Sequence, residues 1–179
     1  MEKAQAVAAS KGGQLVSPSF QTSRKLKWKC RDGHLFELTW GKVYRRGKWC
    51  PQCGASKGER EIRLILQNLN IQFEQQWSPS FLSSRRYDFK FMYNGQPFLI
   101  EYDGEQHFHY VRKYHRSKKG FEDHQAADKI KTWVPTEQGF RVIRIDYTQI
   151  EHARHHILTA LQVQPMVYLS TPDMYKFLL

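Results

Sequence analysis

The sequence predicts an α/β fold in two parts, a small basic N-terminal module and a larger core with a mixed sheet. Between residues 56 and 163, segments with helical and strand periodicity follow in the order helix, three strands, helix, strand, helix. All three cysteines lie between residues 30 and 53. Residues 1–54 carry 11 bases and 3 acids, whereas residues 55–179 carry 17 and 14. We therefore expect a module at 1–55 with a lead helix at 2–11, a core at 56–163 and a tail at 164–179.

The cysteine-bearing stretch KWKCRDGHLFELTWGKVYRRGKWCPQCG has the residue types of a metal site. An intracellular chain seldom forms disulfides, and three cysteines cannot all pair. Cys50 and Cys53 form a C-x₂-C pair, and Cys30 and His34 would complete a Cys₃His set, which is common for structural zinc. A redox pair at Cys50 and Cys53 is the alternative. A catalytic zinc is disfavoured, because four protein ligands leave no open position.

This stretch also resembles the treble-clef zinc-ribbon modules, whose pattern runs W-x-C, G-H-x-[WF] and C-P-x-C. The resemblance covers about residues 28–54 and implies zinc bound by Cys30, His34, Cys50 and Cys53. Cations interleaved with tryptophans predict a DNA-binding surface, because cations contact phosphates and aromatic faces contact bases. A solvated basic face over a small aromatic core is the alternative. The predicted DNA contacts are Lys27, Lys29, Lys42, Arg45, Arg46 and Lys48.

The core begins with a helix and a strand hairpin. Ser56-Lys57-Gly58-Glu59 is typical of a capping box, and it is followed by an apolar helical face that ends near residues 68–70. The predicted strands, rich in aromatic and β-branched residues, are 71–77, 85–93 and 96–103. Asn94-Gly95 predicts a tight turn between the last two strands. Three adjacent strands favour an antiparallel meander.

The second half of the core is predicted from the same signals. A helix is expected from Phe121 to Trp133, and a strand at 140–147. A second capping box, Thr148 to Glu151, is expected to open a helix whose inward residues are Ile150, Ile157, Leu158 and Leu161. The chain lacks GxGxxG and GxxxxGK[ST] motifs, which removes support for a nucleotide-binding fold.

Acids stand where the hairpin would otherwise be apolar. Strand alternation places Glu101 and Asp103 on one face, and Asp88 lies on the partner strand. A buried unpaired carboxylate is costly, so converging acids require a counter-charge, and oxygen ligands favour Mg²⁺ or Mn²⁺. Glu59 on the inward face of the first core helix would join them. The alternatives are a purely capping Glu59, an ion pair of Asp88 with Arg85 or Arg86, and a structural pair of Glu101 and Asp103 with Arg144.

Asp88-x₁₂-Glu101 in this order of elements is similar to the PD-(D/E)XK nuclease superfamily. The stretch R-Y-D-F…L-I-E-Y-D-G-E-Q-H resembles its very-short-patch-repair-like branch, which includes homing endonucleases. The likeness spans about residues 56–147. It implies a restriction-endonuclease-like αβββαβ core that hydrolyses DNA phosphodiester bonds with Mg²⁺ or Mn²⁺. It also implies that Asp88 and Glu101 bind the catalytic metal and that Glu59 is an accessory acid.

One departure concerns the lysine of the superfamily's Glu-x-Lys motif, because that position is Asp103 here. The branch implies His107 as a base, and a solvated loop histidine is the alternative. The predicted catalytic set is therefore Glu59, Asp88, Glu101, Asp103 and His107. The candidates to replace the lysine are His107, Gln106, and Lys129 or Lys131. Gln125 and Asp128 are expected to brace the site. The loop at 107–120 is expected to bind DNA phosphates, and a mobile loop that only adds solubility is the alternative. Its predicted phosphate contacts are Arg112, Lys113, Arg116, Lys118 and Lys119.

The sequence also bears on partners and location. The net charge of +11 favours a polyanionic partner. No apolar run reaches the roughly 18 residues that cross a bilayer, and the N-terminus lacks the apolar stretch of a signal peptide. We expect an intracellular protein of the cytoplasm, nucleoid or nucleus that binds DNA, and a homodimer would suit double-strand cleavage. The alternatives are an inactive zinc-containing nucleic-acid-binding protein, which the missing lysine supports, and an RNA-directed nuclease.

Overall fold

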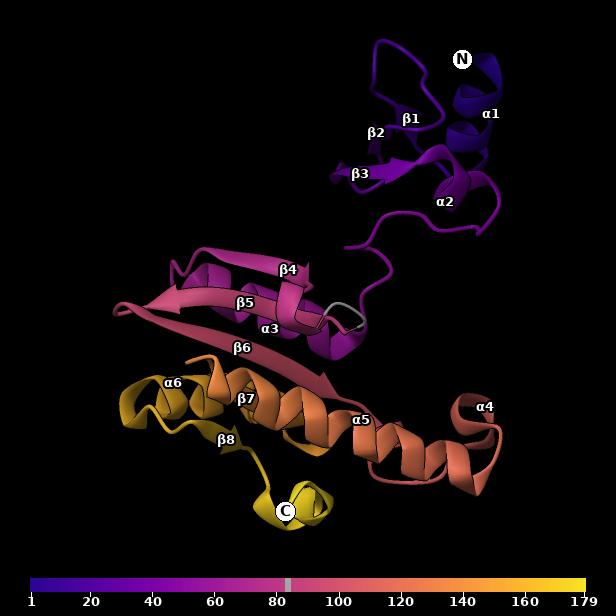
Figure 1. Ribbon diagram of the computed structural model, residues 1–179. Helices are drawn as coiled ribbons and strands as arrows, with labels where there is room; N and C mark the ends of the chain where they lie inside the picture. Colours follow the sequence, from indigo (N-terminus) through magenta and orange to yellow (C-terminus); the bar gives the residue numbers. More distant parts are fainter. Residues whose placement is uncertain (83–84) are drawn as a thin grey trace. The chain divides into compact units, whose positions relative to one another are not determined.

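Two units make up the chain in the computed structural model, which describes residues 1–82 and 85–179. The first unit is Met1–Ser56 and the second is Lys57–Leu179 (Figure 1). The sheets of the two units differ in kind. The first unit has a three-stranded antiparallel sheet, and the second has a mixed five-stranded sheet. The predicted α/β class is therefore confirmed.

The first unit packs short elements around one buried tryptophan. Its elements are α1 (Glu2–Ser10), β1 (Gln14–Leu15), β2 (Lys25–Lys29), β3 (Leu35–Thr39) and α2 (Trp40–Tyr44). Strand β2 alternates strictly, so that Leu26 and Trp28 are buried while its three lysines are exposed. The Trp28 indole Nε1 donates a hydrogen bond to the Leu38 carbonyl. The aromatic core predicted beneath the basic residues is thus present.

The sheet of the second unit has the order β4-β5-β6-β7-β8. Its strands are β4 (Phe73–Trp77), β5 (Tyr87–Tyr93), β6 (Gln96–Asp103), β7 (Arg141–Asp146) and β8 (Val167–Leu169). The first three form the predicted antiparallel meander, whereas β6, β7 and β8 run parallel. Asn94 and Gly95 both have positive φ, as the predicted two-residue hairpin turn requires.

Helices cover both faces of this sheet. The main core lies between one face and the helices α3 (Lys57–Asn68) and α6 (Ala153–Val163). Helix α5 (Lys118–Glu137) packs on the opposite face, where its backbone carbonyls accept hydrogen bonds from Tyr87 and Arg144 (Figure 1). The shorter helices are η1 (Ser80–Leu82), η2 (Glu105–His107), α4 (Arg112–His115), η3 (Tyr147–His152) and η4 (Pro172–Leu178).

The structure corrects several expected boundaries. Helix α5 is longer at both ends than the expected segment and continues through Pro135. Thr148 does not cap a helix; instead the Asp146 carboxylate accepts from the Thr148 backbone, and a 3₁₀ turn precedes α6. Leu158, expected to point inward, is exposed. The segment 107–120, expected as a loop, contains helix α4 and the first residues of α5.

The C-terminal residues belong to the second unit. Strand β8 extends the sheet beside β7, and the side chain of Tyr175 in η4 is fully buried. Lys129 and Trp133 of α5 donate hydrogen bonds to the backbone carbonyls of Leu179 and Leu178. The segment expected as a tail is therefore docked. Within residues 1–82 and 85–179, no helix is long and apolar enough to cross a membrane.

Candidate functional site

Three cysteines and one histidine of the first unit converge on one point. His34 Nδ1 lies 3.4 Å from Cys30 Sγ, 3.6 Å from Cys50 Sγ and 3.3 Å from Cys53 Sγ, and the Cys30 and Cys53 sulfurs are 3.5 Å apart. Ligands about 2.3 Å from a tetrahedral ion lie roughly 3.7 Å from one another. The four residues predicted from the sequence therefore form a cluster that could hold zinc.

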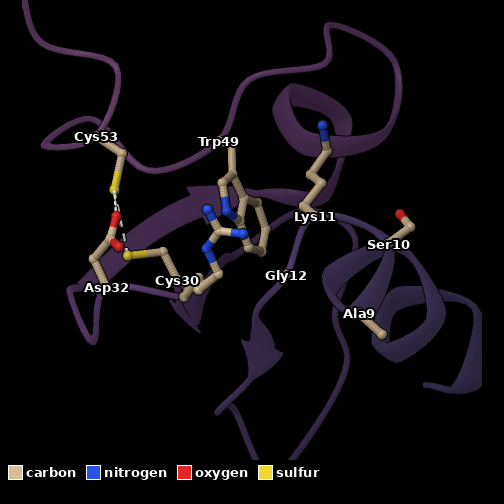
Figure 2. A pocket seen from close by; sticks show the side chains of 9 residues that line it. Ala9, Ser10, Lys11, Gly12, Cys30, Asp32, Trp49 and Cys53 are labelled. Atoms are coloured by element: carbon tan, nitrogen blue, oxygen red, sulfur yellow. Dashed lines mark hydrogen bonds between the residues drawn. The ribbon is translucent and has the colours of Figure 1, made fainter.

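Short backbone turns build this cluster. The backbone N–H of Cys53 donates to Cys50 Sγ, as expected for a C-x₂-C turn, and Gly33 beside His34 has a φ of +82°. Figure 2 shows the pocket beside the cluster, where Asp32 and Cys53 point toward one another. The Cys53 Sγ to Asp32 Oδ2 distance is 3.1 Å. Trp49 lines the same pocket and packs edge-on against Trp28 and Phe36.

The predicted basic residues of the first unit lie on its surface. Lys27 and Lys29 project from the exposed face of β2 together with Lys25. The remaining predicted contacts, which lie on or after α2, are also exposed; they are Lys42, Arg45, Arg46 and Lys48. Because β2 alternates, its lysines form one row while the tryptophan between them serves the core.

In the second unit, Asp88 and Glu101 are neighbours across two strands. The register pairs Phe89 with Ile100, so Asp88 and Glu101 are the next residues on β5 and β6. Asp88 Oδ2 accepts a 2.9 Å hydrogen bond from the backbone N–H of Tyr102. Burial, followed by the negative charges of Glu101 and Glu59, raises the pKa of Asp88 well above its usual value. The two acids therefore interact electrostatically.

One carboxylate oxygen of Glu101 accepts a hydrogen bond, and the other has no hydrogen-bond partner among the described residues. Its Oε2 accepts a 2.6 Å hydrogen bond from Lys131 Nζ of α5. Its Oε1 is buried and has no hydrogen-bond partner among the described residues. Burial raises the pKa of Glu101, although Lys131 and Arg144 act in the opposite direction. A buried carboxylate oxygen without a partner is costly, which favours an additional ligand at this point.

Glu59 reaches the two acids through Gln76. Gln76 Nε2 donates to Glu59 Oε2 and to Asp88 Oδ1, at 3.1 Å in both cases. Gln76 lies inside β4 with a φ of +52°, opposite Asp88, so a local irregularity of the strand directs its side chain to the carboxylates. A Cβ at Gly58 would lie 2.3 Å from the Tyr102 ring, so this glycine allows the first turn of α3 to approach β6.

The carboxylates of Glu59, Asp88 and Glu101 are less tightly grouped than the cysteine cluster. In the described part of the chain, two sets of side chains bring three or more ligand atoms within 4.8 Å of one another. One is the Cys₃His cluster, and the other is His107, His124 and Asp128. The three acids do not form such a set.

Asp103, predicted among the catalytic acids, is instead part of a buried ion pair. Arg144 of β7 donates to both carboxylate oxygens, at 2.8 Å and 2.5 Å, and the Tyr175 hydroxyl donates to Asp103 Oδ2. Asp103 and Arg144 are both fully buried. The structural pairing left open from the sequence therefore applies to Asp103 but not to Glu101, which pairs with Lys131.

His107, the last residue of η2, is held against α5. Its Nδ1 lies 2.6 Å from Asp128 Oδ2 and 3.5 Å from Asp103 Oδ1. Burial alone would lower the pKa of His107, but the hydrogen bond to Asp128 and the two negative charges raise it. Gln125 Nε2 donates to the His107 carbonyl. The histidine is thus not a solvated loop residue, and Gln125 and Asp128 brace it.

The other predicted site residues are dispersed. The side chain of Gln106 folds back toward Gly104, and Lys129 donates to the Leu179 carbonyl. Lys119 forms an ion pair with Asp123, and the amine of Lys113 lies over the Tyr114 ring. All the predicted cations of residues 107–120 are exposed; they are Arg112, Lys113, Arg116, Lys118 and Lys119.

Sequence reasoning missed three residues of the site. Gln76 gives no sequence signal, because its role depends on an irregular strand. Tyr175 comes from a segment that had no assigned structure. His124 could have been found, because it precedes Asp128 by four residues, the spacing that places two side chains on one helix face.

Comparison of the chain with protein-family models, curated proteins and solved structures finds no match.

Proposed function

We propose that the chain is a metal-dependent endodeoxyribonuclease of the homing or repair type, with a restriction-endonuclease-like core in its second unit. The order α3, β4, β5, β6, α5, β7 corresponds to the αβββαβ order that the sequence resemblance implies. The acids that the resemblance assigns to the metal, Asp88 and Glu101, lie at adjacent positions of adjacent strands. The order of elements and the position of the acids together support the proposal.

The observation that carries the proposal is the state of the Glu101 carboxylate. One oxygen is paired with Lys131 and the other is buried without a partner, beside an Asp88 whose pKa is raised by burial and by neighbouring negative charge. A divalent cation would relieve both costs, because it supplies positive charge and accepts an oxygen ligand. The donor set is carboxylate oxygen, which suits Mg²⁺ or Mn²⁺.

The residues around these acids have distinct parts in the proposed reaction. A bound Mg²⁺ or Mn²⁺ would lower the pKa of a water and stabilise charge on the phosphoryl group. Asp88 and Glu101 would hold the ion. Glu59 would orient Asp88 through Gln76, whose amide nitrogen bonds both carboxylates. Lys131 replaces the lysine missing at position 103, because its amine reaches Glu101 from the neighbouring helix.

His107 is the proposed base. Its Nδ1 is bonded to Asp128, which leaves Nε2 to accept a proton from the attacking water. The hydrogen bond to Asp128 fixes the ring and stabilises the imidazolium that forms. Asp103 and Arg144 contribute indirectly, because they hold Asp128 in place through the Arg144 guanidinium.

Exposed cations supply the contacts to the DNA backbone. The row of lysines on β2 and the cations after α2 would bind phosphates, with the Cys₃His zinc keeping the turns that carry them folded. In the second unit, the exposed cations around α4 would bind phosphates close to the cleavage site.

A plasmid-cleavage assay tests the proposal. Wild type, Glu101→Gln and Glu74→Gln would be incubated with supercoiled DNA and Mg²⁺, with and without prior metal removal. Glu74 is an exposed acid on β4 that pairs with Lys90, so its variant controls for loss of one negative charge. We expect Glu101→Gln to lose at least about a hundredfold in rate, on the scale of removing a principal electrostatic group. Equal rates for the three proteins would refute the assignment.

Two further outcomes separate the alternatives. A folded wild type that binds DNA but leaves the plasmid supercoiled in Mg²⁺ and in Mn²⁺ would favour an inactive nucleic-acid-binding protein. Competition between duplex DNA and structured RNA at one fixed salt concentration tests the substrate, because phosphate contacts alone depend strongly on salt. Preferential cleavage of RNA would replace the DNA assignment with the RNA-directed one.

A further inference from the structure

A second group of potential metal ligands lies between η2 and α5. It consists of His107, His124 and Asp128, whose ligand atoms all lie within 4.8 Å of one another. The ring centroids of His107 and His124 are 4.7 Å apart, and the His115 ring lies 5.3 Å beyond His124. These residues are separate from the Cys₃His cluster of the first unit and include neither Asp88 nor Glu101.

The local fold holds these ligands in place. His124 and Asp128 are four residues apart on α5 and therefore share one face of the helix. Gln125 between them donates to the His107 carbonyl, which fixes η2 against α5. Asp128 is also held from behind, because Arg144 Nη2 lies 3.3 Å from Asp128 Oδ1. Ligands braced by outer hydrogen bonds in this way are typical of metal sites.

The charges of this region leave a negative excess. Asp103 and Asp128 are buried carboxylates, and Arg144 is the buried cation that contacts both of them. Lys131, on the next turn of α5, is paired with Glu101. The pair of aspartates thus carries one negative charge more than Arg144 balances. Either a proton on His107 or a bound cation can balance it.

We propose that His107, His124 and Asp128 bind one transition-metal ion of the Zn²⁺, Co²⁺ or Ni²⁺ type. Two imidazoles and one carboxylate are ligands that these ions prefer, whereas Mg²⁺ favours oxygen alone. His107 and His124 are both partly exposed, so an ion can enter from solvent while Asp128 stays buried. Three protein ligands leave positions open for water or for a phosphate oxygen.

This site would regulate the proposed nuclease, an extension that rests on the proposed function. An ion bound at either ring nitrogen of His107 withdraws electron density from the imidazole, which lowers its affinity for the proton of the attacking water. Zn²⁺ is therefore expected to inhibit cleavage supported by Mg²⁺, and His124→Ala is expected to weaken that inhibition. Among the described residues, His124 forms no hydrogen bond or ion pair with Asp88 or Glu101, so its loss leaves the proposed Mg²⁺ ligands in place.

Metal binding can be measured without DNA. Protein with one zinc at the Cys₃His cluster would be titrated with Co²⁺ and followed by visible absorption and by metal analysis. We expect one further equivalent, with weak visible bands and no sulfur-to-cobalt charge transfer, because no sulfur is a ligand. His124→Ala is expected to bind this equivalent at least about a hundredfold more weakly. His109→Ala removes an exposed histidine nearby and is the matched control.

The outcomes distinguish the proposal from its alternatives. A wild type that binds no second Co²⁺, or a His124→Ala variant that binds it as wild type does, would overturn the proposal. If wild type binds no second Co²⁺, NMR titration of the imidazole nitrogens is expected to show that a proton on His107 balances the extra negative charge of Asp103 and Asp128. Circular dichroism of His124→Ala checks that its fold is intact. Failure of the plasmid assay, by contrast, would refute the nuclease and leave this binding result unaffected.

Discussion

The Tyr87 hydroxyl donates a 2.9 Å hydrogen bond to the backbone carbonyl of Lys131. In a regular α-helix this carbonyl would accept from the backbone N–H four residues later, but that residue is Pro135, which has no N–H. Tyr87 therefore supplies the donor that the proline cannot. The same tyrosine ring lies 5.2 Å from the Lys131 amine, so β5 holds both the backbone and the side chain of this lysine.

Tyr87→Phe is expected to destabilise the second unit. The variant keeps the buried ring but leaves the Lys131 carbonyl without a donor, which costs about 1–3 kcal/mol for a buried polar group. Urea unfolding measures the change in the free energy of unfolding. Tyr114→Phe removes the hydroxyl of an exposed tyrosine and is expected to have little effect. Equal losses in the two variants would show that the Tyr87 hydroxyl has no special role.

Lys131→Met is expected to reduce DNA cleavage at least about a hundredfold, because the proposed cationic group next to Glu101 is lost. Lys129→Met provides the comparison, since Lys129 lies two residues away and bonds the Leu179 carbonyl instead. Plasmid-nicking rates at saturating Mg²⁺ measure both. If Lys129→Met proved the more damaging change, the replacement lysine would have been assigned to the wrong residue.

The parts of the fold that the sequence predicted are those with local causes. The hairpin follows from Asn94-Gly95, and the cysteine cluster follows from ligand spacing within 24 residues. The acids Asp88 and Glu101 could be placed together because a short hairpin fixes the register of the strands that carry them. Each of these features is determined by residues that lie close together in the sequence.

The parts that the sequence did not predict depend on distant partners. The helix was expected to end at Trp133, yet α5 continues through Pro135, and Tyr87, 44 residues before Lys131, satisfies the carbonyl that the proline leaves free. Asp103 was assigned to the catalytic set, and its pairing with Arg144 of β7 was only an alternative, while its second partner, Tyr175 of the C-terminal segment, was not predicted at all. Residue spacing carries no information about such contacts.

Asp103→Asn is expected to impair folding. The substitution replaces the carboxylate that accepts two hydrogen bonds from the buried Arg144 with a neutral amide and leaves Asp128, 3.3 Å away, as its anionic partner. Breaking a buried ion pair costs up to about 3–5 kcal/mol. Asp103 would instead be a catalytic acid if its variant were as stable as wild type but inactive. Urea unfolding and plasmid cleavage of the same preparation distinguish the two. Asp173→Asn, which removes an exposed acid paired with Lys176, is the control for charge.

Removal of zinc is expected to unfold the first unit and to leave the second folded. The Cys₃His cluster joins β2, the turn after it and the C-x₂-C segment, and a module of this size has little other core. Limited proteolysis after chelation is expected to cut within residues 1–56 and to spare residues 57–179. Tryptophan fluorescence follows the exposure of the buried Trp28. An intact first unit after complete metal removal would contradict a structural role for the metal.

Asp88→Asn is expected to abolish cleavage and yet to stabilise the metal-free protein. The raised pKa of Asp88 means that the folded state binds its proton more tightly than the unfolded state does. Stability contributed by this group therefore falls as pH rises from the unfolded pKa of about 4 to the higher folded pKa. The cost of placing a carboxyl group at this buried position beside Glu101 and Glu59 therefore grows as pH rises above about 4, and asparagine removes that cost.

The variant and wild type are therefore expected to have similar stability at about pH 4 and to diverge by roughly 1 kcal/mol or more at pH 7. Urea unfolding at both pH values, in buffer free of Mg²⁺, measures the difference. Added Mg²⁺ is expected to stabilise wild type and close the gap, while leaving Asp88→Asn unchanged. A variant less stable than wild type at pH 7 without Mg²⁺ would mean that Asp88 is satisfied by Gln76 and the Tyr102 backbone alone, and that its pair with Glu101 requires no ion.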